Sequence, residues 1–221
     1  LISKNLAGYI SIFLILLTTF ISALVNIYLT LILISYLLIQ LIYCLKLKSK
    51  PLIDLFCISS GFLLRSISGL LASELELSPW FILSIGLLSL FLAAEKRKAE
   101  LLIFQQTGIC TREVLTYYSV PLLSRLESNL ATSTFICYAL WAAGPVVNGA
   151  SSSLMLLTTP IVLIGIFRYQ LLSDKGESIL KKDRNLNLIT EKPELVLLND
   201  IGIKLIIFSW LLLTSLIGFL A

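Results

Sequence analysis

Seven long runs of apolar residues, separated by shorter polar segments, make up the hydropathy pattern of this chain. A bilayer core of about 30 Å needs roughly 20 helical residues, and most of the runs are close to that length. Because unpaired backbone groups are costly in lipid, we expect each run to form a helix. The predicted spans are Leu6–Val25, Ile27–Leu45, Leu52–Ala72, Trp80–Ala94, Leu122–Ala143, Leu154–Leu172 and Ile201–Leu220. The sequence therefore predicts an all-α fold, a polytopic transmembrane helical bundle, with residues 1–221 as a single integral-membrane domain.

The composition agrees with a membrane protein and excludes several other classes. Of the 221 residues, 57% are hydrophobic and 14% are charged, which leaves too little polar surface to cover a soluble globule. A water-soluble enzyme, a disordered chain and a nucleic-acid-binding module are thereby excluded. The chain has no histidine, and its four cysteines form no CxxC pair, so a zinc site or a histidine-based triad is not expected.

The basic residues of the connecting segments fall on one side of the predicted membrane. If the spans alternate in direction, every Lys and Arg of these segments lies on the side of the N-terminus, and the opposite side has none. The positive-inside rule places the charged side in the cytoplasm. We therefore expect a multi-pass protein of the cell (inner) membrane. Its long cytoplasmic segments, Glu95–Pro121 and Ser173–Asp200, are candidates for function, and the first is expected to contain a short amphipathic helix around Arg112–Tyr118.

The fourth run, Trp80–Ala94, is too short to cross a bilayer unless its helix continues through Glu95–Glu100. Lys96 and Glu100 are four residues apart and would share one helical face. Two interpretations stay open for this segment. Its side chains either snorkel to the headgroups with a supporting ion pair, or they form a cationic wall that binds phosphate beside an acidic partner.

Two charges lie inside the third predicted span. Asp54 and Arg65 are eleven residues apart, which places them on one stripe of the helix about 16 Å apart. That distance excludes a direct salt bridge, so each needs another partner and the stripe should face protein or water. Arg65 is either a structural anchor or a ligand for substrate phosphate.

Further cations gather at the predicted cytoplasmic opening. Tyr43, Lys46 and Lys48 end the second span, and Arg168 lies near the end of the sixth. The lysines either only set the topology of the chain in the membrane or form part of a basic cytoplasmic opening. Arg168 is either an interfacial anchor or a ligand for substrate phosphate. An opening rich in cations attracts polyanions with exposed phosphates or anionic lipid headgroups.

An ordered set of motifs in this chain resembles the motifs of the decaprenyl-phosphate phosphoribosyltransferases, a branch of the UbiA superfamily of membrane prenyltransferases. The resemblance covers nearly the whole chain. Its motifs are Tyr43-x-x-Lys46-x-Lys48, Asp54, Ser60–Gly69, Leu77–Phe81, Lys96-Arg97-x-x-Glu100-Leu101, Tyr117-Tyr118, Arg168-Tyr169 and Glu194–Asp200.

The resemblance implies a nine-helix bundle around a cavity that opens to the cytoplasm and to lipid. It implies transfer of 5-phosphoribose from phosphoribosyl pyrophosphate (PRPP) to polyprenyl (decaprenyl) phosphate, with release of pyrophosphate and a requirement for Mg²⁺, for the synthesis of arabinan and other cell-wall polysaccharide precursors. Carried over by motif, the catalytic residues would be Asp54, Lys96, Arg97 and Glu100, and the substrate phosphate would be bound by Tyr43, Lys46, Lys48, Arg65, Tyr118 and Arg168.

The chain departs from the family in its acidic motifs. The family's first Asp-rich motif, NDxxDxxxD, is absent, and the seven predicted spans would match the third to ninth family helices. We therefore expect the sequence to begin just after that motif, and we identify no metal ligand in it. Where many superfamily members carry DxxxD, this chain has Glu95, Glu100 and three cations, which favours the phosphoribosyl branch. The alternatives are a UbiA-type prenyltransferase that joins a prenyl diphosphate to an aromatic acceptor, and a non-catalytic membrane subunit or carrier. Membrane lipid is an expected partner, and a homo-oligomer stays open.

Overall fold

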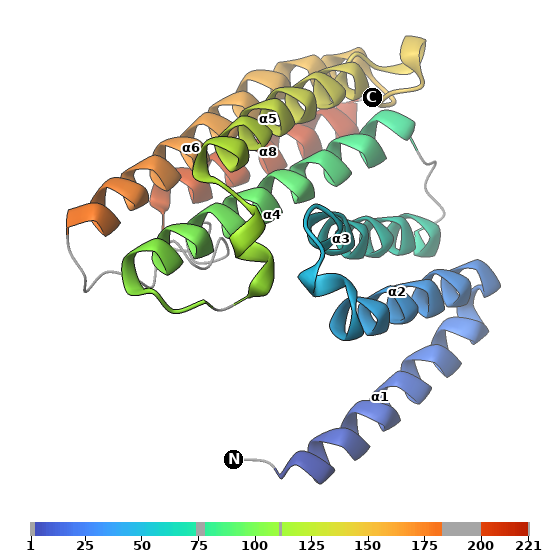
Figure 1. Cartoon of the computed structure of the whole chain (residues 1–221). Helices are drawn as coiled ribbons and strands as arrows, with labels where there is room; N and C mark the ends of the chain where they lie inside the picture. The colour runs from blue at the N-terminus through green and yellow to red at the C-terminus, as the bar shows by residue number, and fades with distance from the viewer. Residues whose placement is uncertain (1–2, 74–77, 111, 183–199, 221) are drawn as a thin grey trace.

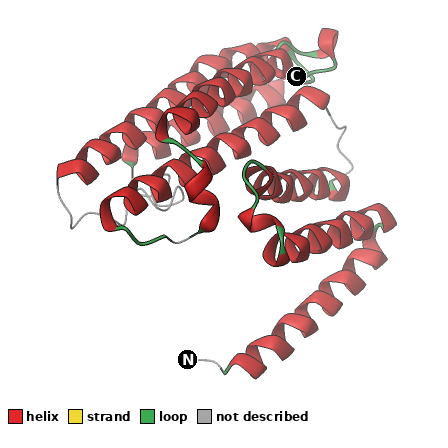
Figure 2. Cartoon of the chain, viewed as in Figure 1, coloured by secondary structure: helices red, strands yellow, loops and turns green. Residues whose placement is uncertain are grey.

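The computed structural model describes residues 3–73, 78–110, 112–182 and 200–220, and these residues form helices and loops with no strand (Figure 2). Seven long helices occupy the positions of the seven predicted spans, so the predicted helical bundle is confirmed. They are α1 (Lys4–Val25), α2 (Ile27–Leu45), α3 (Ile53–Ala72), α4 (Pro79–Thr107), α5 (Val120–Ala142), α6 (Thr159–Lys182) and α8 (Ile201–Leu220).

The boundaries of these helices follow from local capping chemistry. Asn26 separates α1 from α2, and its side chain accepts a hydrogen bond from the backbone N–H of Tyr28 at 2.8 Å. Pro79 stands in the first turn of α4, where its missing N–H costs nothing. Gly108 ends that helix in the left-handed conformation, with φ of 72°, which residues with a Cβ adopt at a cost.

Within the described residues, six helical segments are long and apolar enough to cross a membrane. They comprise α1, α2, α3, α4, α8 and the segment Ser153–Ser173, which joins the 3₁₀ helix η4 (Ser153–Thr158) to most of α6. The helix α5 is not among them, and its first half carries Arg125, Glu127 and Asn129. The chain is thus a multi-pass membrane protein, and α5 carries charged and polar side chains within the apolar bundle.

Helices that follow one another along the chain pack side by side. Figure 1 shows α1, α2 and α3 forming one arm, while α4, α5, α6 and α8 lie together in a second group. The helix α4 joins the two groups, because it packs against α3 on one side and against α5 and α6 on the other. Buried apolar clusters occupy both sides of it, with Leu55, Leu101 and Leu115 on the first side and Phe91, Ile166 and Ile203 on the second.

The helix α4 runs without a break through Glu95–Glu100, which confirms the predicted continuation beyond Ala94. After it, the chain forms a short 3₁₀ helix, η2 (Glu113–Tyr117), where the sequence predicted a short amphipathic helix. Val114 and Leu115 are buried on its inner face, whereas Glu113, Thr116 and Tyr117 are exposed. A second 3₁₀ turn, η1 (Leu47–Ser49), joins α2 to α3 and contacts η2.

Candidate functional site

A fully buried ion pair joins α3 to α4. Asp54 lies in the first turn of α3 and Arg97 in the C-terminal half of α4, and both are 0% exposed. The Arg97 Nε donates to Asp54 Oδ2 at 2.7 Å, and Arg97 Nη1 donates to Glu100 Oε2 one turn further along α4. Charges removed from water are tolerated where partners and hydrogen bonds compensate them, as they do here. The guanidinium is therefore held between two carboxylates from two helices.

Tyr118 completes the surroundings of Asp54. Its hydroxyl donates to Asp54 Oδ1 at 2.7 Å and accepts the backbone N–H of Leu52 at 2.7 Å. Leu52 has a φ of 65°, a strained conformation for a residue with a branched side chain, and it directly precedes α3. Burial and the hydrogen bond to Asp54 raise the pKa of Tyr118 well above its ordinary value, so the phenol stays neutral and remains a donor.

Arg112 connects this group to α2 and to the loop before η2. Its Nη1 donates to the hydroxyl of Tyr43 at 3.0 Å, and its Nε lies 3.6 Å from Glu100 Oε2. Arg112 is about one-third exposed, whereas Arg97 is enclosed. We call these six residues the Asp54–Arg97 network; its members are Tyr43, Asp54, Arg97, Glu100, Arg112 and Tyr118.

A second buried ionic group lies on the opposite face of α4. Lys98 Nζ lies 2.7 Å from Glu127 Oε2 of α5 and 3.6 Å from Glu95 Oε1. Two side chains of α6 close the group, because Gln170 donates to Glu127 at 3.2 Å and Ser173 donates to Glu95. We call these five residues the Lys98 cluster. Residues 95 and 98 project about 200° around the helix from residues 97 and 100, which explains why the two groups face different neighbours.

The structure brings together five of the ten predicted site residues, Tyr43, Asp54, Arg97, Glu100 and Tyr118. Lys96 is half-buried beside them on α4. The ion pair expected between Lys96 and Glu100 is not among the salt bridges of the described residues, because Glu100 pairs with Arg97 and Arg112 instead.

The other predicted residues lie outside this network. Lys46 and Lys48 are exposed in the turn between α2 and α3. Arg65 donates to the hydroxyl of Tyr36 and lies over its ring at 5.1 Å, so it links α3 to α2. Arg168 forms two hydrogen bonds with Asp200, at 2.8 and 2.9 Å. These contacts are those of the anchor interpretation for Arg65 and Arg168. Of the motif Glu194–Asp200, only Asp200 lies within the described residues, and Leu77 also lies outside them.

Sequence reasoning did not assign Arg112, Lys98, Glu95 or Glu127 to a site. In the sequence, Arg112 is only a charged residue of a connecting segment. Its place in the network depends on contacts with residues that are far away in the sequence. Glu127 did carry a signal, since an acidic residue inside a predicted span needs a partner. That partner, Lys98, is 29 residues away, on another helix.

The described residues contain no group of three or more His, Cys, Asp or Glu side chains that could hold a metal ion. Both oxygens of Asp54 are already engaged, by Arg97 and by Tyr118. The described part of the chain therefore does not fit a magnesium site made of protein ligands alone.

The fold and this site define a class, that of polytopic helical membrane proteins with buried ionic groups toward one end of the bundle. The chain matches no protein-family model. It is 32% identical over 183 residues to the decaprenyl-phosphate phosphoribosyltransferase of Mycolicibacterium smegmatis, a match that covers 80% of this chain and 54% of the relative. The enzyme of the same name from Mycobacterium tuberculosis (strain ATCC 25618 / H37Rv) is 32% identical over 183 residues, which are 83% of this chain and 56% of the relative.

The corresponding protein of Corynebacterium glutamicum is 42% identical over 106 residues, covering 48% of this chain and 32% of the relative. These matches confirm the resemblance to decaprenyl-phosphate phosphoribosyltransferases that the motifs predicted. The chain spans about half the length of the two mycobacterial relatives.

Proposed function

We propose that this chain is part of a membrane phosphoribosyltransferase of the UbiA type. The donor is PRPP, and the acceptor is polyprenyl (decaprenyl) phosphate. An oxygen of the acceptor phosphate forms a bond to C1 of the ribose, and the bond from C1 to the pyrophosphate oxygen breaks, so pyrophosphate leaves with the bonding electrons. The names of the homologous proteins support the transferred group and the acceptor.

The observation that carries this proposal is the state of Arg97. Its Nε and Nη1 are held by Asp54 and Glu100, while its buried Nη2 has no hydrogen-bond partner within the described residues. A buried donor without a partner is costly, and a phosphate oxygen would satisfy it. Fixed charges of this kind stabilise a leaving pyrophosphate without having to reorganise during the reaction.

The remaining residues of the network have supporting roles in the proposal. Tyr118 fixes Asp54, and Asp54 in turn fixes the plane of the Arg97 guanidinium. Lys96 and Arg112 are the partly accessible cations next to Arg97 and would complete the phosphate contacts. Lys46 and Lys48, exposed in η1 and the turn before it, would attract the anionic substrates toward this end of the bundle.

The orientation in the membrane belongs to the same proposal. The lysines of the turn around η1, the cations of α4 and Arg112 before η2 share one end of the described bundle, as the contacts between η1, η2 and α4 indicate. We infer that this end faces the cytoplasm, where PRPP is available, and that the protein resides in the cell membrane.

The Mg²⁺ requirement remains a prediction from the family resemblance. Magnesium in proteins is commonly bound through one or two carboxylates together with substrate phosphates. When bound, it would neutralise charge on the pyrophosphate. The described residues supply no complete set of ligands for it, so we assign no step of the reaction to it.

The test uses membranes from cells that express the gene. They are incubated with PRPP labelled in the ribose and with polyprenyl phosphate, and lipid-linked phosphoribose and released pyrophosphate are measured. Equal amounts of both products support the proposal. A parallel reaction with a prenyl diphosphate and an aromatic acceptor tests the other UbiA-type activity. Product in that reaction alone, or in neither, contradicts the proposal.

A further inference from the structure

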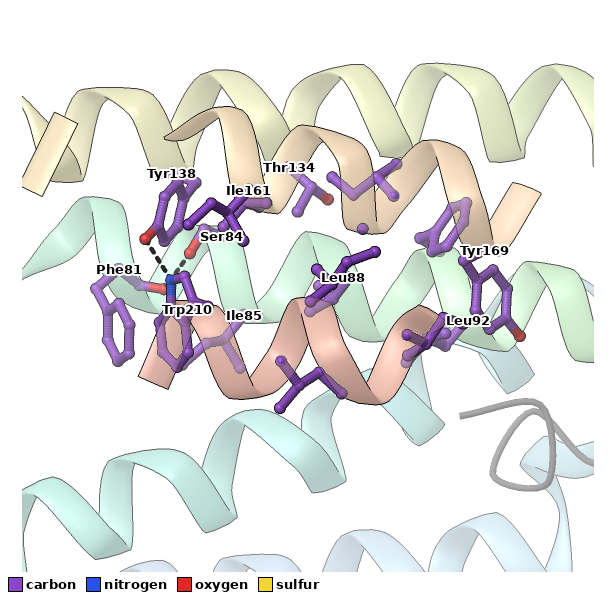
Figure 3. Close-up of a pocket in the computed structure, with 17 residues that line it drawn as sticks. Phe81, Ser84, Ile85, Leu88, Leu92, Thr134, Tyr138, Ile161, Tyr169 and Trp210 are labelled. Atoms are coloured by element: carbon purple, nitrogen blue, oxygen red, sulfur yellow. Dashed lines mark hydrogen bonds between the residues drawn. The ribbon is translucent and has the colours of Figure 1, made fainter. Parts of the chain in front are cut away.

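An apolar cavity of about 400 Å³ lies between α4, α5, α6 and α8. Figure 3 shows that its wall consists almost entirely of aliphatic and aromatic side chains. Along α4 it extends from Phe81 to Leu92, or about 17 Å at the rise of an α-helix. Gly165 of α6 also lines the cavity, and a Cβ at that position would lie 3.3 Å from Cγ2 of Ile206 on α8.

A cavity of this size and character binds apolar molecules. An engineered apolar cavity of ~150 Å³ in a soluble protein excludes water and takes up benzene. The present cavity is larger, and three of its four helices belong to segments apolar enough to cross a membrane. At that depth the surrounding medium consists of hydrocarbon chains. A hydrocarbon chain is therefore the ligand that fits both the lining and the location.

The two ends of the cavity differ in chemistry. At one end, Trp210 Nε1 donates to the hydroxyl of Tyr138 at 2.7 Å, and that hydroxyl is 2.6 Å from Thr158 Oγ1. The ring of Trp141 packs against those of Phe81 and Tyr138, with ring centroids 5.0 and 5.3 Å apart. All three tryptophans of the chain lie at or near this end, since Trp80 directly precedes Phe81. Clustered tryptophan and tyrosine side chains are typical of the zone where lipid headgroups meet the hydrocarbon core.

At the other end, aromatic rings line the cavity next to the Lys98 cluster. Phe91 and Tyr169 meet edge to face, with ring centroids 5.5 Å apart. One helical turn beyond them, Ser173 donates to Glu95. The cluster contains two carboxylates around Lys98, so this end does not suit a phosphate headgroup.

We propose that this cavity holds one acyl chain of a membrane phospholipid from the leaflet on the tryptophan side, as a bound structural lipid distinct from the polyprenyl acceptor. The headgroup lies near Trp80 and Trp141, and the chain reaches toward Phe91 and Tyr169. We assign the cavity to a phospholipid and not to the acceptor, because the acceptor phosphate must reach the donor bound at Arg97, and Arg97 lies on the face of α4 that packs against α3, away from the cavity. This last step rests on the proposed function, whereas the binding of a hydrocarbon chain does not.

The test compares two glycine substitutions in the full-length protein, purified in detergent and washed to remove loose lipid. Gly165→Leu adds a side chain to the cavity wall, where its Cβ would lie 3.3 Å from Cγ2 of Ile206, whereas Gly218→Leu on α8 meets no atom within 4 Å of its Cβ position. Phospholipid that remains bound is measured by mass spectrometry. The wild type and Gly218→Leu should retain it, and Gly165→Leu should lose most of it. Equal retention by both variants, or no retained phospholipid in the wild type, overturns the proposal.

A second measurement adds no volume to the cavity wall. Phospholipid with brominated acyl chains is added to the detergent-solubilised wild-type protein, and quenching of tryptophan fluorescence is recorded, with Trp210→Phe as the comparison. Quenching that Trp210→Phe reduces supports a chain inside the cavity, and quenching that it leaves unchanged contradicts it. Polyprenyl phosphate is then added without PRPP. If it restores the fluorescence, the cavity belongs to the acceptor and the structural lipid is rejected, a result that leaves the proposed reaction intact.

Discussion

Lys96 and Arg97 are neighbours in α4 and carry the same charge, but their surroundings differ. Arg97 is enclosed and paired with Asp54 and Glu100, whereas Lys96 is only half-buried. Removal of Arg97 leaves two carboxylates without their shared partner, so Arg97→Ala should lower the free energy of unfolding by about 3–5 kcal/mol. Lys96→Ala should leave stability unchanged and lower phosphoribosyl transfer by about 10²–10³-fold.

Thermal unfolding in detergent and turnover with labelled PRPP separate the two effects. Arg97→Lys is the matched variant, because it retains the charge but loses the planar fork that reaches both carboxylates. It should be more stable than Arg97→Ala and less active than the wild type. Normal turnover in Lys96→Ala would show that Lys96 snorkels to the headgroups and binds no substrate.

Tyr117 and Tyr118 offer a second pair of neighbours with different environments. Tyr118 is buried, with its hydroxyl joining Asp54 to the backbone of Leu52, whereas Tyr117 is 69% exposed. Tyr118→Phe removes one donor and one acceptor from buried partners, so it should lower the free energy of unfolding by about 1–3 kcal/mol. Tyr117→Phe should have no measurable effect. Equal melting temperatures for the two variants would show that Tyr118 does not hold the turn before α3.

At the scale of elements, α4 is the helix that organises the candidate site. Its C-terminal half presents Arg97 and Glu100 to α3 and the loop before η2, and Glu95 and Lys98 to α5 and α6. Both faces are buried, and so this stretch of α4 is enclosed although it is highly charged. A helix fixed on both sides holds a guanidinium in one orientation, as a site based on preorganised charges requires.

The carboxylate of Asp200 both caps the start of α8 and pairs with Arg168. Asp200 Oδ1 accepts the backbone N–H of Ile203 at 2.7 Å, and both of its oxygens accept from Arg168. The hydrogen bonds from Arg168, followed by that from Ile203, lower the pKa of Asp200 from its ordinary 3.8 to about 2. Because the folded state binds the proton more weakly than the unfolded state, this contact stabilises the fold above the ordinary pKa and is lost as the pH falls toward 2.

The pH dependence of Asp200→Asn tests this contact. The variant should melt below the wild type by a constant margin between pH 7 and pH 5, and the margin should shrink as the pH falls below about 4. Arg168→Gln and the double variant complete a cycle that isolates the pair. A margin that stays constant down to the lowest pH at which the wild type folds would contradict a role for the charge of Asp200.

How far the sequence predicted the structure depended on the range of each interaction. The bounds of Ile27–Leu45 were predicted exactly as α2 has them, because apolar length and the Asn26 cap are local signals. The pairing of Asp54 with Arg97 spans 43 residues and could not be read from spacing. The spacing along the helix allows Glu100 to pair with either Lys96 or Arg97. The packing of α3 and of the loop before η2 determines which of these ion pairs forms.

At the scale of the whole molecule, the two ends of the bundle differ in chemistry. One end carries the cations and carboxylates of α4 together with η1 and η2. At the other end, Ser78 donates to the backbone oxygen of Asn148 at 2.8 Å, and Trp80 donates to that of Val147 at 2.8 Å. The first end is suited to anionic substrates and the second to the headgroup zone of the bilayer, which gives the molecule a direction across the membrane.

This direction can be measured with cysteines as reporters. Cys110 is exposed in the loop after α4, at the ionic end, and Ser151 is exposed in the loop before η4, at the other end. In a Cys44→Ser background, Cys110 should react with a membrane-impermeant maleimide in inverted vesicles and stay unreactive in spheroplasts, with Cys110→Ser as the control. Ser151→Cys, introduced into the background that lacks Cys44 and Cys110, should react only in spheroplasts. The intervening α5 must cross the bilayer for the two positions to differ. Labelling of both from one side would therefore show that α5, which carries Arg125 and Glu127, does not span the membrane.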